Sequence, residues 1–174
     1  MGNLPPDYEP MPFAVETERL TMRLWEASDA TGYRELVGER GDEKPTLEEA
    51  EREIEGARDS APGRGIHLLT IRRREEGEFL GYCGLIVGRA SVDEPEIAYE
   101  LLRSAHGHGY ATEAAAAILD IAIATGRRRL WATVGAWNTP SFRVLEKIGF
   151  RRDHATPDAR GELVWLVRDL RASP

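Results

Sequence analysis

Basic residues are scarce in this sequence, and the shortage limits the partners that the protein can have. The 174 residues include 23 Lys and Arg against 30 Asp and Glu, which gives a formal net charge of −7. Binding of nucleic acid needs a surplus of basic charge to neutralise phosphates. We therefore predict that nucleic acid is not a partner.

Long apolar runs and paired cysteines are missing as well. No run approaches the roughly 20 apolar residues that cross a bilayer, which predicts no membrane partner. The single cysteine, Cys83, excludes an internal disulfide and fits a reducing compartment. The first 13 residues carry no basic-then-apolar targeting signal. These absences predict a cytoplasmic protein.

The sequence does contain the material for one domain. Its length suits a single core, and 41% hydrophobic with 30% charged residues is ordinary for a globular protein. Residues 1–13 are spaced by prolines and predict an extended N-terminal arm. Residues 14–174 show no internal repeat and no linker, so we assign them to one domain.

Apolar periodicity predicts a mixed sheet with helices on both faces, an α/β fold. Ser28 and Asp29 are candidate caps of the first helix, and Thr46 with Glu49 forms a capping box for the second. The predicted strands cover 19–24, 65–73, 78–88, 96–102, 129–134, 150–153 and 163–169, and two later helices cover 110–125 and 140–148. A polar loop is expected at 154–161.

The stretch AHGHGYATEA, residues 105–114, follows a predicted strand and begins a predicted helix. The first amides of a helix have no partner inside it, and the helix dipole adds positive charge there. Glycines let the backbone approach a phosphate closely. Thr112 stands where a dinucleotide fingerprint needs its third glycine, and no P-loop lysine follows. The stretch thus predicts an anion site of another kind.

A second motif, AWNTPSFRVLEKIGF at 136–150, follows one strand after that helix. With both motifs in this order, and with Thr17-Glu18-Arg19-Leu20 near the start, the whole chain resembles the GNAT acetyltransferase superfamily. Within it, the chain is similar to the branch that acetylates ribosomal-protein N-termini and related amines. The resemblance implies a single-domain GNAT-like fold with a mixed, mostly antiparallel sheet. Ser104 departs from the Gln or Arg that many members carry there, which implies an altered pyrophosphate contact.

The resemblance also implies how acetyl-CoA, the acyl donor, would be bound. Asn138 would hydrogen-bond the pantetheine arm, and no metal is expected. The backbone residues implied in binding are Leu101, Leu102 and Arg103 for the pantetheine arm, and His106, Gly107, His108, Gly109, Tyr110, Ala111 and Thr112 for the pyrophosphate.

The implied reaction is direct attack of an amine on the thioester in a ternary complex, which needs orientation and proton transfer. Strand alternation places Glu96 and Glu100 on one face, and Glu100 is nearer the glycine loop. Glu100 is our first candidate base and Glu96 the second, although both could be exposed strand carboxylates. Ser141 could reprotonate the departing thiolate, or it could only satisfy backbone amides at its helix start.

Several questions stay open on the sequence alone. The acceptor could be a protein N-terminus, a free amino acid, a polyamine or an aminoglycoside, in a pocket built by residues 28–62 and 154–161. A non-catalytic acyl-CoA-binding module would show the same motifs, and a homodimer is possible because dimers are common in such families. His106 and His108 lack a third metal ligand at suitable spacing, and Cys83 is expected as a buried thiol.

Overall fold

Eight strands form one sheet in the order β1-β2-β3-β4-β5-β6-β8-β7 in the computed structural model, which describes residues 7–171. All neighbouring strands pair antiparallel except β5 and β6, which run parallel. The strands are β1 Ala14–Glu16, β2 Leu20–Arg23, β3 Leu68–Arg73, β4 Phe79–Ile86, β5 Glu96–Leu101, β6 Arg129–Gly135, β7 Arg151–Asp158 and β8 Gly161–Asp169. The predicted mixed, mostly antiparallel sheet is confirmed.

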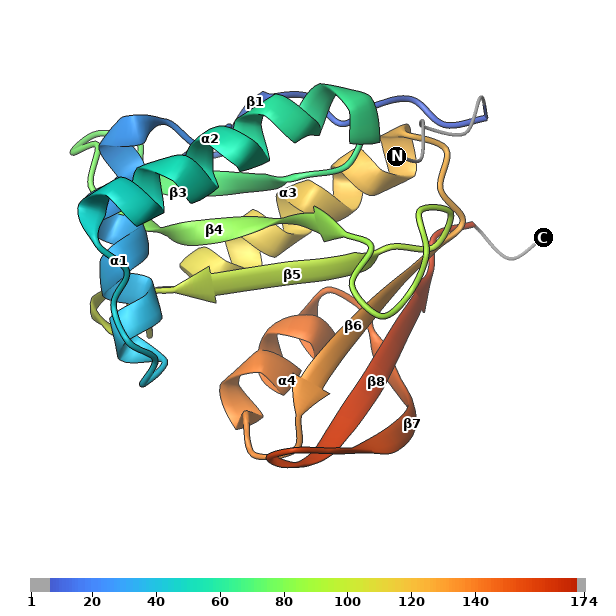
Figure 1. The fold of residues 1–174 in the computed structure, drawn as a ribbon. Helices are drawn as coiled ribbons and strands as arrows, with labels where there is room; N and C mark the ends of the chain where they lie inside the picture. The colour runs from blue at the N-terminus through green and yellow to red at the C-terminus, as the bar shows by residue number, and fades with distance from the viewer. Residues whose placement is uncertain (1–6, 172–174) are drawn as a thin grey trace.

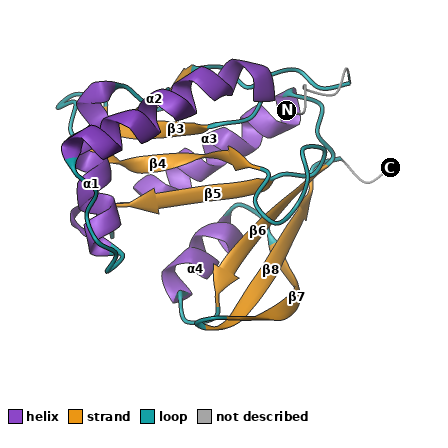
Figure 2. Cartoon of the chain, in the orientation of Figure 1, coloured by secondary structure: helices purple, strands orange, loops and turns teal. Residues whose placement is uncertain are grey.

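Helices cover both faces of this sheet, as predicted. Helices α1 and α2 lie on one face and α3 lies on the other (Figures 1 and 2). The helices are α1 Ala30–Glu39, α2 Leu47–Arg64, α3 Tyr110–Ala124 and α4 Thr139–Lys147, with short 3-10 turns at Ala27–Asp29 and Arg103–Ala105. The capping box of α2 is formed, because the Glu49 amide donates to Thr46 Oγ1 at 3.2 Å and the Thr46 amide donates to Glu49 Oε2 at 2.7 Å. No helix within residues 7–171 has the length and apolar character that a bilayer crossing requires.

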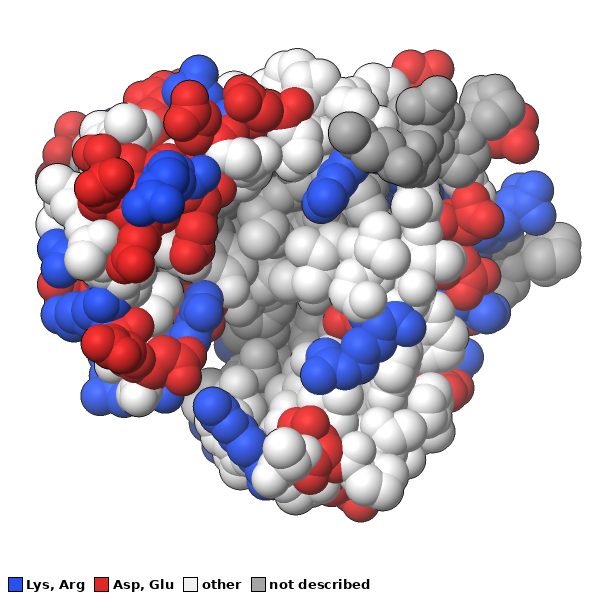
Figure 3. Space-filling view, in the orientation of Figure 1, with Lys and Arg blue, Asp and Glu red and all other residues white. Residues whose placement is uncertain are grey.

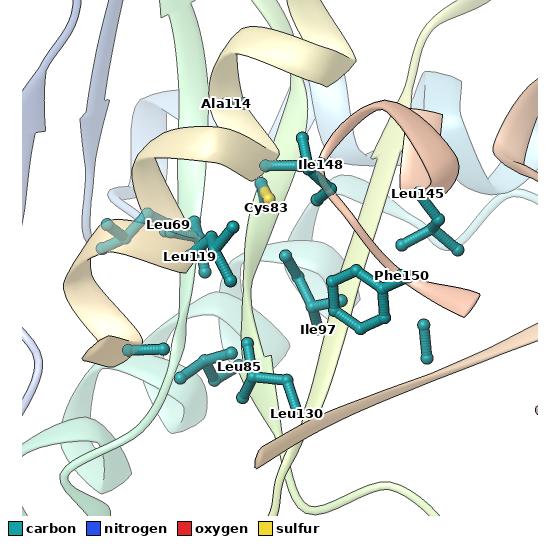
Figure 4. Close-up of a cluster of buried hydrophobic side chains, with 14 of the residues drawn as sticks. Leu69, Cys83, Leu85, Ile97, Ala114, Leu119, Leu130, Leu145, Ile148 and Phe150 are labelled. Atoms are coloured by element: carbon teal, nitrogen blue, oxygen red, sulfur yellow. The ribbon is translucent and has the colours of Figure 1, made fainter. Parts of the chain in front are cut away.

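The main core lies between the sheet and helices α3 and α4 (Figure 4). Small residues such as Ala114 let α3 lie close to the strands, while Leu145 of α4 fills the space beside it. Cys83 is fully buried in this core, and burial raises the pKa of its thiol. The thiol therefore stays protonated, as expected of a core cysteine and not of a nucleophile.

The predicted extended arm lies partly outside the described residues, which begin at 7. From there it packs on the domain: the Met11 amide donates to the Gly65 carbonyl at 2.9 Å, and the Met11 side chain is 2% exposed. β1 follows directly, so the arm leads into the edge of the sheet.

Two elements differ from the prediction: the short strand β1 was not predicted, and the loop at 154–161 was predicted wrongly. β7 extends through Asp158 and pairs with β8, so only residues 159–160 form a turn. β7 is the last strand of the sheet and is exposed along almost its whole length. An edge strand without a buried face has no apolar alternation to reveal it, and an edge also tolerates Pro157.

Asp29 was predicted as a helix cap, and the structure gives it another role. It occupies the position before α1 and makes no cap hydrogen bond to that helix, although it takes part in the capping box of the preceding 3-10 turn. The fully buried carboxylate instead accepts hydrogen bonds from Arg23 of β2 and Arg72 of β3, and from the Glu26 amide. Asp29 thus ties the start of α1 to two strands.

Candidate functional site

The parallel strands β5 and β6 diverge from one another (Figure 1). Their register contains a single pair, Glu96 with Trp131, so the strands separate toward the carboxyl end of β5. A cavity of about 960 Å³ lies at this end, within the size range of sites for cofactors and drug-sized ligands. We call it the main cavity.

Most predicted site residues meet in this cavity, although they come from separate parts of the sequence. The predicted residues that line it are Glu100, Leu101, Arg103, His106, Gly107, Gly109, Tyr110, Ala111, Thr112, Asn138 and Ser141. The other three, Glu96, Leu102 and His108, are not among its lining residues. The two sequence motifs therefore face one another across a single cleft.

The glycine loop has the geometry of an anion cradle. Gly107 and Gly109 adopt φ angles of 79° and 78°, in the left-handed region that favours glycine. A Cβ added at Gly107 would meet no atom within 4 Å, so the backbone there borders open space. Gly109 is the N-cap of α3 and offers no side chain to its first amides. These amides remain available to an anionic ligand at the cavity wall.

Arg19 supports the loop from outside the cavity. Its NH1 group donates to the His108 carbonyl at 2.8 Å, and its guanidinium lies 4.6 Å from the centre of the Tyr110 ring. Glu113 in the first turn of α3 binds Arg19 Nε at 2.7 Å and Thr17 Oγ1 at 2.6 Å. Burial alone would raise the pKa of Glu113, but hydrogen bonds from Thr17 and Arg19 outweigh it and lower the pKa. The early motif thus stabilises a loop some ninety residues later.

The open edge of β5 offers backbone groups to the cleft. The Leu102 amide donates to the Leu80 carbonyl at 2.8 Å. Because backbone groups alternate in direction along a strand, the N–H and C=O groups of Glu100 and Leu102 point toward β4. The peptide groups of Tyr99 and Leu101 therefore point to the opposite edge, where β6 has diverged. His106 Nε2 lies 2.9 Å from the Leu101 carbonyl, which can accept a hydrogen bond from it. An extended ligand could pair with this edge as an added strand.

Two of the predicted backbone contacts already have partners inside the protein. The Leu102 amide belongs to the β4–β5 ladder, and the Arg103 amide donates to Glu39 Oε2 at 2.8 Å. Tyr99, which sequence reasoning did not select, supplies edge groups in their place. The direction of the Tyr99 peptide groups follows from the hydrogen-bond register of β4 and β5, which cannot be deduced from the sequence.

A hydroxyl pair spans the cleft between β5 and α4. Ser141 Oγ donates to Tyr99 Oη at 3.1 Å, and Tyr99 Oη donates to the Ser141 carbonyl at 3.2 Å. Burial raises the pKa of Tyr99 to about 12, although the hydrogen bond from Ser141 opposes that rise. The tyrosine therefore keeps its proton and can donate it. Sequence reasoning missed Tyr99 because alternation places it on the face opposite the two glutamates.

The two candidate bases occupy different surroundings. Glu100 lines the main cavity, and both of its carboxylate oxygens lie 2.8 Å from Arg40 Nε of α1. Glu96 is 4% exposed and accepts hydrogen bonds from the Arg89 amide and the Thr133 hydroxyl. The β4–β5 register runs without a shift, so the predicted alternation holds along β5.

Asn138 caps α4 and lines the cavity. Its Oδ1 accepts a hydrogen bond from the Ser141 amide at 3.3 Å, so the side-chain oxygen serves the helix. The side-chain amide also carries two N–H donors for a ligand. A substitution can therefore keep the cap and remove the two N–H donors.

Replacement of Asn138 by serine is expected to keep the cap and lose the ligand contact. Serine and asparagine cap helices about equally well, whereas alanine costs about 1 kcal/mol of stability. We expect Asn138→Ser to melt like wild type and to bind acetyl-CoA about tenfold more weakly. Asn138→Ala should show the same loss of affinity and should also melt at a lower temperature. Thermal unfolding and calorimetric titration measure the two effects. Wild-type affinity in Asn138→Ser would refute the contact.

The charge of the cavity wall is opposite in sign to that of the chain. Five basic and two acidic side chains line the main cavity, although the whole chain carries −7. The basic residues are Arg40, Arg103, Arg143, Lys147 and Arg160. Figure 3 shows the surface hollowed between the side that carries α1 and α2 and the side that carries β6 to β8. The cavity thus suits an extended, anionic ligand.

The two histidines of the loop make different contacts. His106 contacts the Leu101 carbonyl, and the His108 ring lies 5.5 Å from the Tyr110 ring. Within residues 7–171, no three His, Cys, Asp or Glu side chains come together in a way that could bind a metal ion.

Divergent strands, a glycine loop at a helix start and a basic cleft define a protein that binds an extended anionic coenzyme. A family model described as an acetyltransferase (GNAT) domain matches residues 19–151. The chain therefore belongs to the GNAT acetyltransferases, a family whose reaction is acetyl-CoA-dependent acetyl transfer. The resemblance noted in the sequence is confirmed.

Two curated proteins, YkkB and p20, are similar to this chain in sequence, and both are described as uncharacterized. YkkB of Bacillus subtilis is 37% identical over 89 residues, which are 50% of this chain and 52% of that protein. The uncharacterized N-acetyltransferase p20 of Bacillus licheniformis is 28% identical over 159 residues, covering 85% of this chain and 89% of p20. The chain thus spans about half of YkkB and most of p20.

The fold is shared with a ribosomal-protein acetyltransferase of known structure. RimL, the ribosomal L7/L12 alpha-N-protein acetyltransferase solved in complex with coenzyme A, superposes with a TM-score of 0.74 at 16% identity. The match covers 92% of this chain and 98% of RimL. At this identity the likeness shows the fold, and substrates do not carry over with it.

Proposed function

We propose that the protein is an N-acetyltransferase that transfers the acetyl group of acetyl-CoA to a primary amine by direct attack in a ternary complex. The observation that supports this most is the meeting of both motifs in the main cavity. Residues of the glycine loop, residues at the start of α4 and Glu100 all line this one cavity.

The residues of the main cavity fit acetyl-CoA as donor. The first amides of α3 and the glycine loop would hold the pyrophosphate, and Arg143 and Lys147 add positive charge nearby. The free edge at Tyr99 and Leu101, with the amide of Asn138, would hold the pantetheine arm. Bound there, acetyl-CoA supplies a thioester that is already a reactive acyl donor, so no covalent enzyme intermediate is needed.

Proton transfer would be divided between the two sides of β5. Glu100, on the face shared with Tyr82, would accept a proton from the amine nitrogen. The Tyr99–Ser141 hydroxyl pair, on the other face, would donate a proton to the departing sulfur. An α-amine has a pKa of about 7.7–8.0 and is partly neutral at working pH, whereas an alkyl amine needs more help from a base.

The acceptor is the open part of this proposal. A protein N-terminus and a small-molecule amine are both candidates. A cytoplasmic location, a possible homodimer, and the lack of nucleic-acid or membrane partners stay predictions. Light scattering of the purified protein tests the dimer.

The alternative is an acyl-CoA-binding module without turnover. Its motivation is the Arg40–Glu100 ion pair, because the guanidinium already occupies both oxygens of the candidate base. Calorimetric titration with acetyl-CoA, free CoA and NAD comes first, and we expect binding of the two CoA species alone. Turnover with a panel of amines then decides between enzyme and module. Absence of CoA binding would refute both.

A further inference from the structure

A second cavity, of about 250 Å³, lies between α1, α2 and the sheet. Three aromatic rings line it, those of Trp25, Tyr33 and Tyr82, together with the carboxylate of Glu53 on α2. We call it the aromatic cavity. Arg40 lines both this cavity and the main cavity, so the two are neighbours.

The three rings are inclined to one another. The centroids of Trp25 and Tyr33 are 5.7 Å apart with the planes at 84°, and those of Trp25 and Tyr82 are 5.9 Å apart at 49°. The face of an aromatic ring carries negative potential and attracts a cation, most strongly for tryptophan. A cluster of three such rings at a cavity favours an ammonium or guanidinium group over an anion.

Glu53 adds a full negative charge to the same cavity. The Tyr33 hydroxyl donates to Glu53 Oε2, which fixes the carboxylate at the cavity wall. Burial and the hydrogen bond to Glu53 together raise the pKa of Tyr33 to about 12, so the tyrosine remains a donor. A carboxylate accepts several hydrogen bonds and therefore keeps capacity for a cationic ligand.

Arg40 does not cancel this preference. Its guanidinium is bound to Glu100, with Nε 2.8 Å from both carboxylate oxygens, and NH2 lies 3.4 Å from the Tyr82 hydroxyl. Glu53, Glu100 and Arg40 together carry −1. Acidic side chains also gather on the surface over α1 and α2 (Figure 3). These charges would repel an anionic ligand, and a neutral apolar ligand would gain nothing from the carboxylate of Glu53.

We propose that the aromatic cavity binds a second positive charge of the acceptor, away from the amine that is acetylated. This inference rests on the proposed acetyl transfer and names its acceptor class: primary amines that carry a further ammonium or guanidinium group. With the remote cation among the rings, the chain of the acceptor would pass the Arg40–Glu100 pair and bring its amine to Glu100 in the main cavity.

The test compares two acceptors that differ only at the far end, 1,4-diaminobutane and 4-amino-1-butanol. We expect kcat/KM for the diamine to exceed that for the amino alcohol by about tenfold, and Glu53→Gln to remove this preference through KM. Glu55→Gln is the matched control, because Glu55 is exposed on the same helix and outside the cavity lining. Calorimetric binding of the diamine to the CoA-bound protein measures the same contact without turnover.

Each outcome bears on a different statement. Equal use of both acceptors by wild type, with turnover intact, would refute the aromatic cavity and leave acetyl transfer standing. If Glu53→Gln and Glu55→Gln lost the preference for the diamine equally, the preference would come from the overall charge of α2, and the aromatic cavity would again be refuted. Diamine binding that Glu53→Gln weakens, without turnover of any amine, would uphold the cavity and refute the enzyme. The peptides Ala-Lys-Ala and Ala-norleucine-Ala, compared in the same way, distinguish a basic protein N-terminus from a small diamine.

Discussion

Replacement of Glu100 by glutamine is expected to lower kcat/KM about 100-fold with an alkyl amine as acceptor and to leave the Kd of acetyl-CoA unchanged. A primary alkyl amine has a pKa of about 10.4 and is almost fully protonated at pH 7.5, so it depends on a base. An α-amine is partly neutral at that pH and should lose only about tenfold. Steady-state kinetics with both acceptors over a range of pH measures this difference.

The matched comparison is Glu96→Gln, which removes the other candidate carboxylate. Glu96 binds the Arg89 amide and Thr133 in a buried position outside the main-cavity lining, so its loss should affect unfolding and not turnover. Loss of turnover in Glu96→Gln with activity retained in Glu100→Gln would reverse the assignment. A loss that is equal for both acceptors in Glu100→Gln would indicate a positioning effect and not proton transfer.

The sequence predicted elements well wherever a buried face imposed a period. Strand β6 alternates between buried and half-buried residues along its whole length, and its predicted range of 129–134 agrees with Arg129–Gly135. Most of β7 was predicted as a loop, because an exposed edge strand needs no apolar residues. The role of Asp29 was predicted wrongly for a different reason. A helix cap is a local feature of the sequence, whereas Arg23 and Arg72 come close to Asp29 only because the sheet forms.

The site shows the same division between local and assembled features. The glycine loop and the Asn138 cap are short motifs whose chemistry a sequence states directly. Tyr99, Arg40 and the basic side chains of α4 join them through strand register and helix packing, over separations that no motif spans. The aromatic cavity illustrates this best, since Trp25, Tyr33 and Tyr82 have no common spacing and meet only because α1 lies across β4.

Replacement of Asp29 by alanine is expected to lower the free energy of unfolding by about 3 kcal/mol. The carboxylate is fully buried and binds Arg23 and Arg72, so its removal leaves two guanidinium groups without their partner. The estimate lies at the lower end for a broken buried ion pair because both arginines keep some access to water. For a chain of this size the melting temperature should fall by roughly 6–12 °C. The loss should also weaken acceptor binding, because Asp29 anchors the start of the helix that carries Tyr33 and Arg40.

The pH dependence of this loss identifies its cause. Burial alone would raise the pKa of Asp29, but the hydrogen bonds from the arginines and the backbone outweigh it and lower the pKa. A lowered pKa contributes stability that is complete above the unfolded value of about 3.9 and disappears as the pH falls through the folded value. The difference in the free energy of unfolding between wild type and Asp29→Ala should thus be constant from about pH 5 to about pH 8 and should shrink below about pH 4.

Asp59→Ala, which replaces an exposed aspartate of α2, should change stability by no more than about 0.5 kcal/mol. A variant at Asp29 that melts within about 2 °C of wild type would mean that the buried carboxylate does not hold α1 to the sheet.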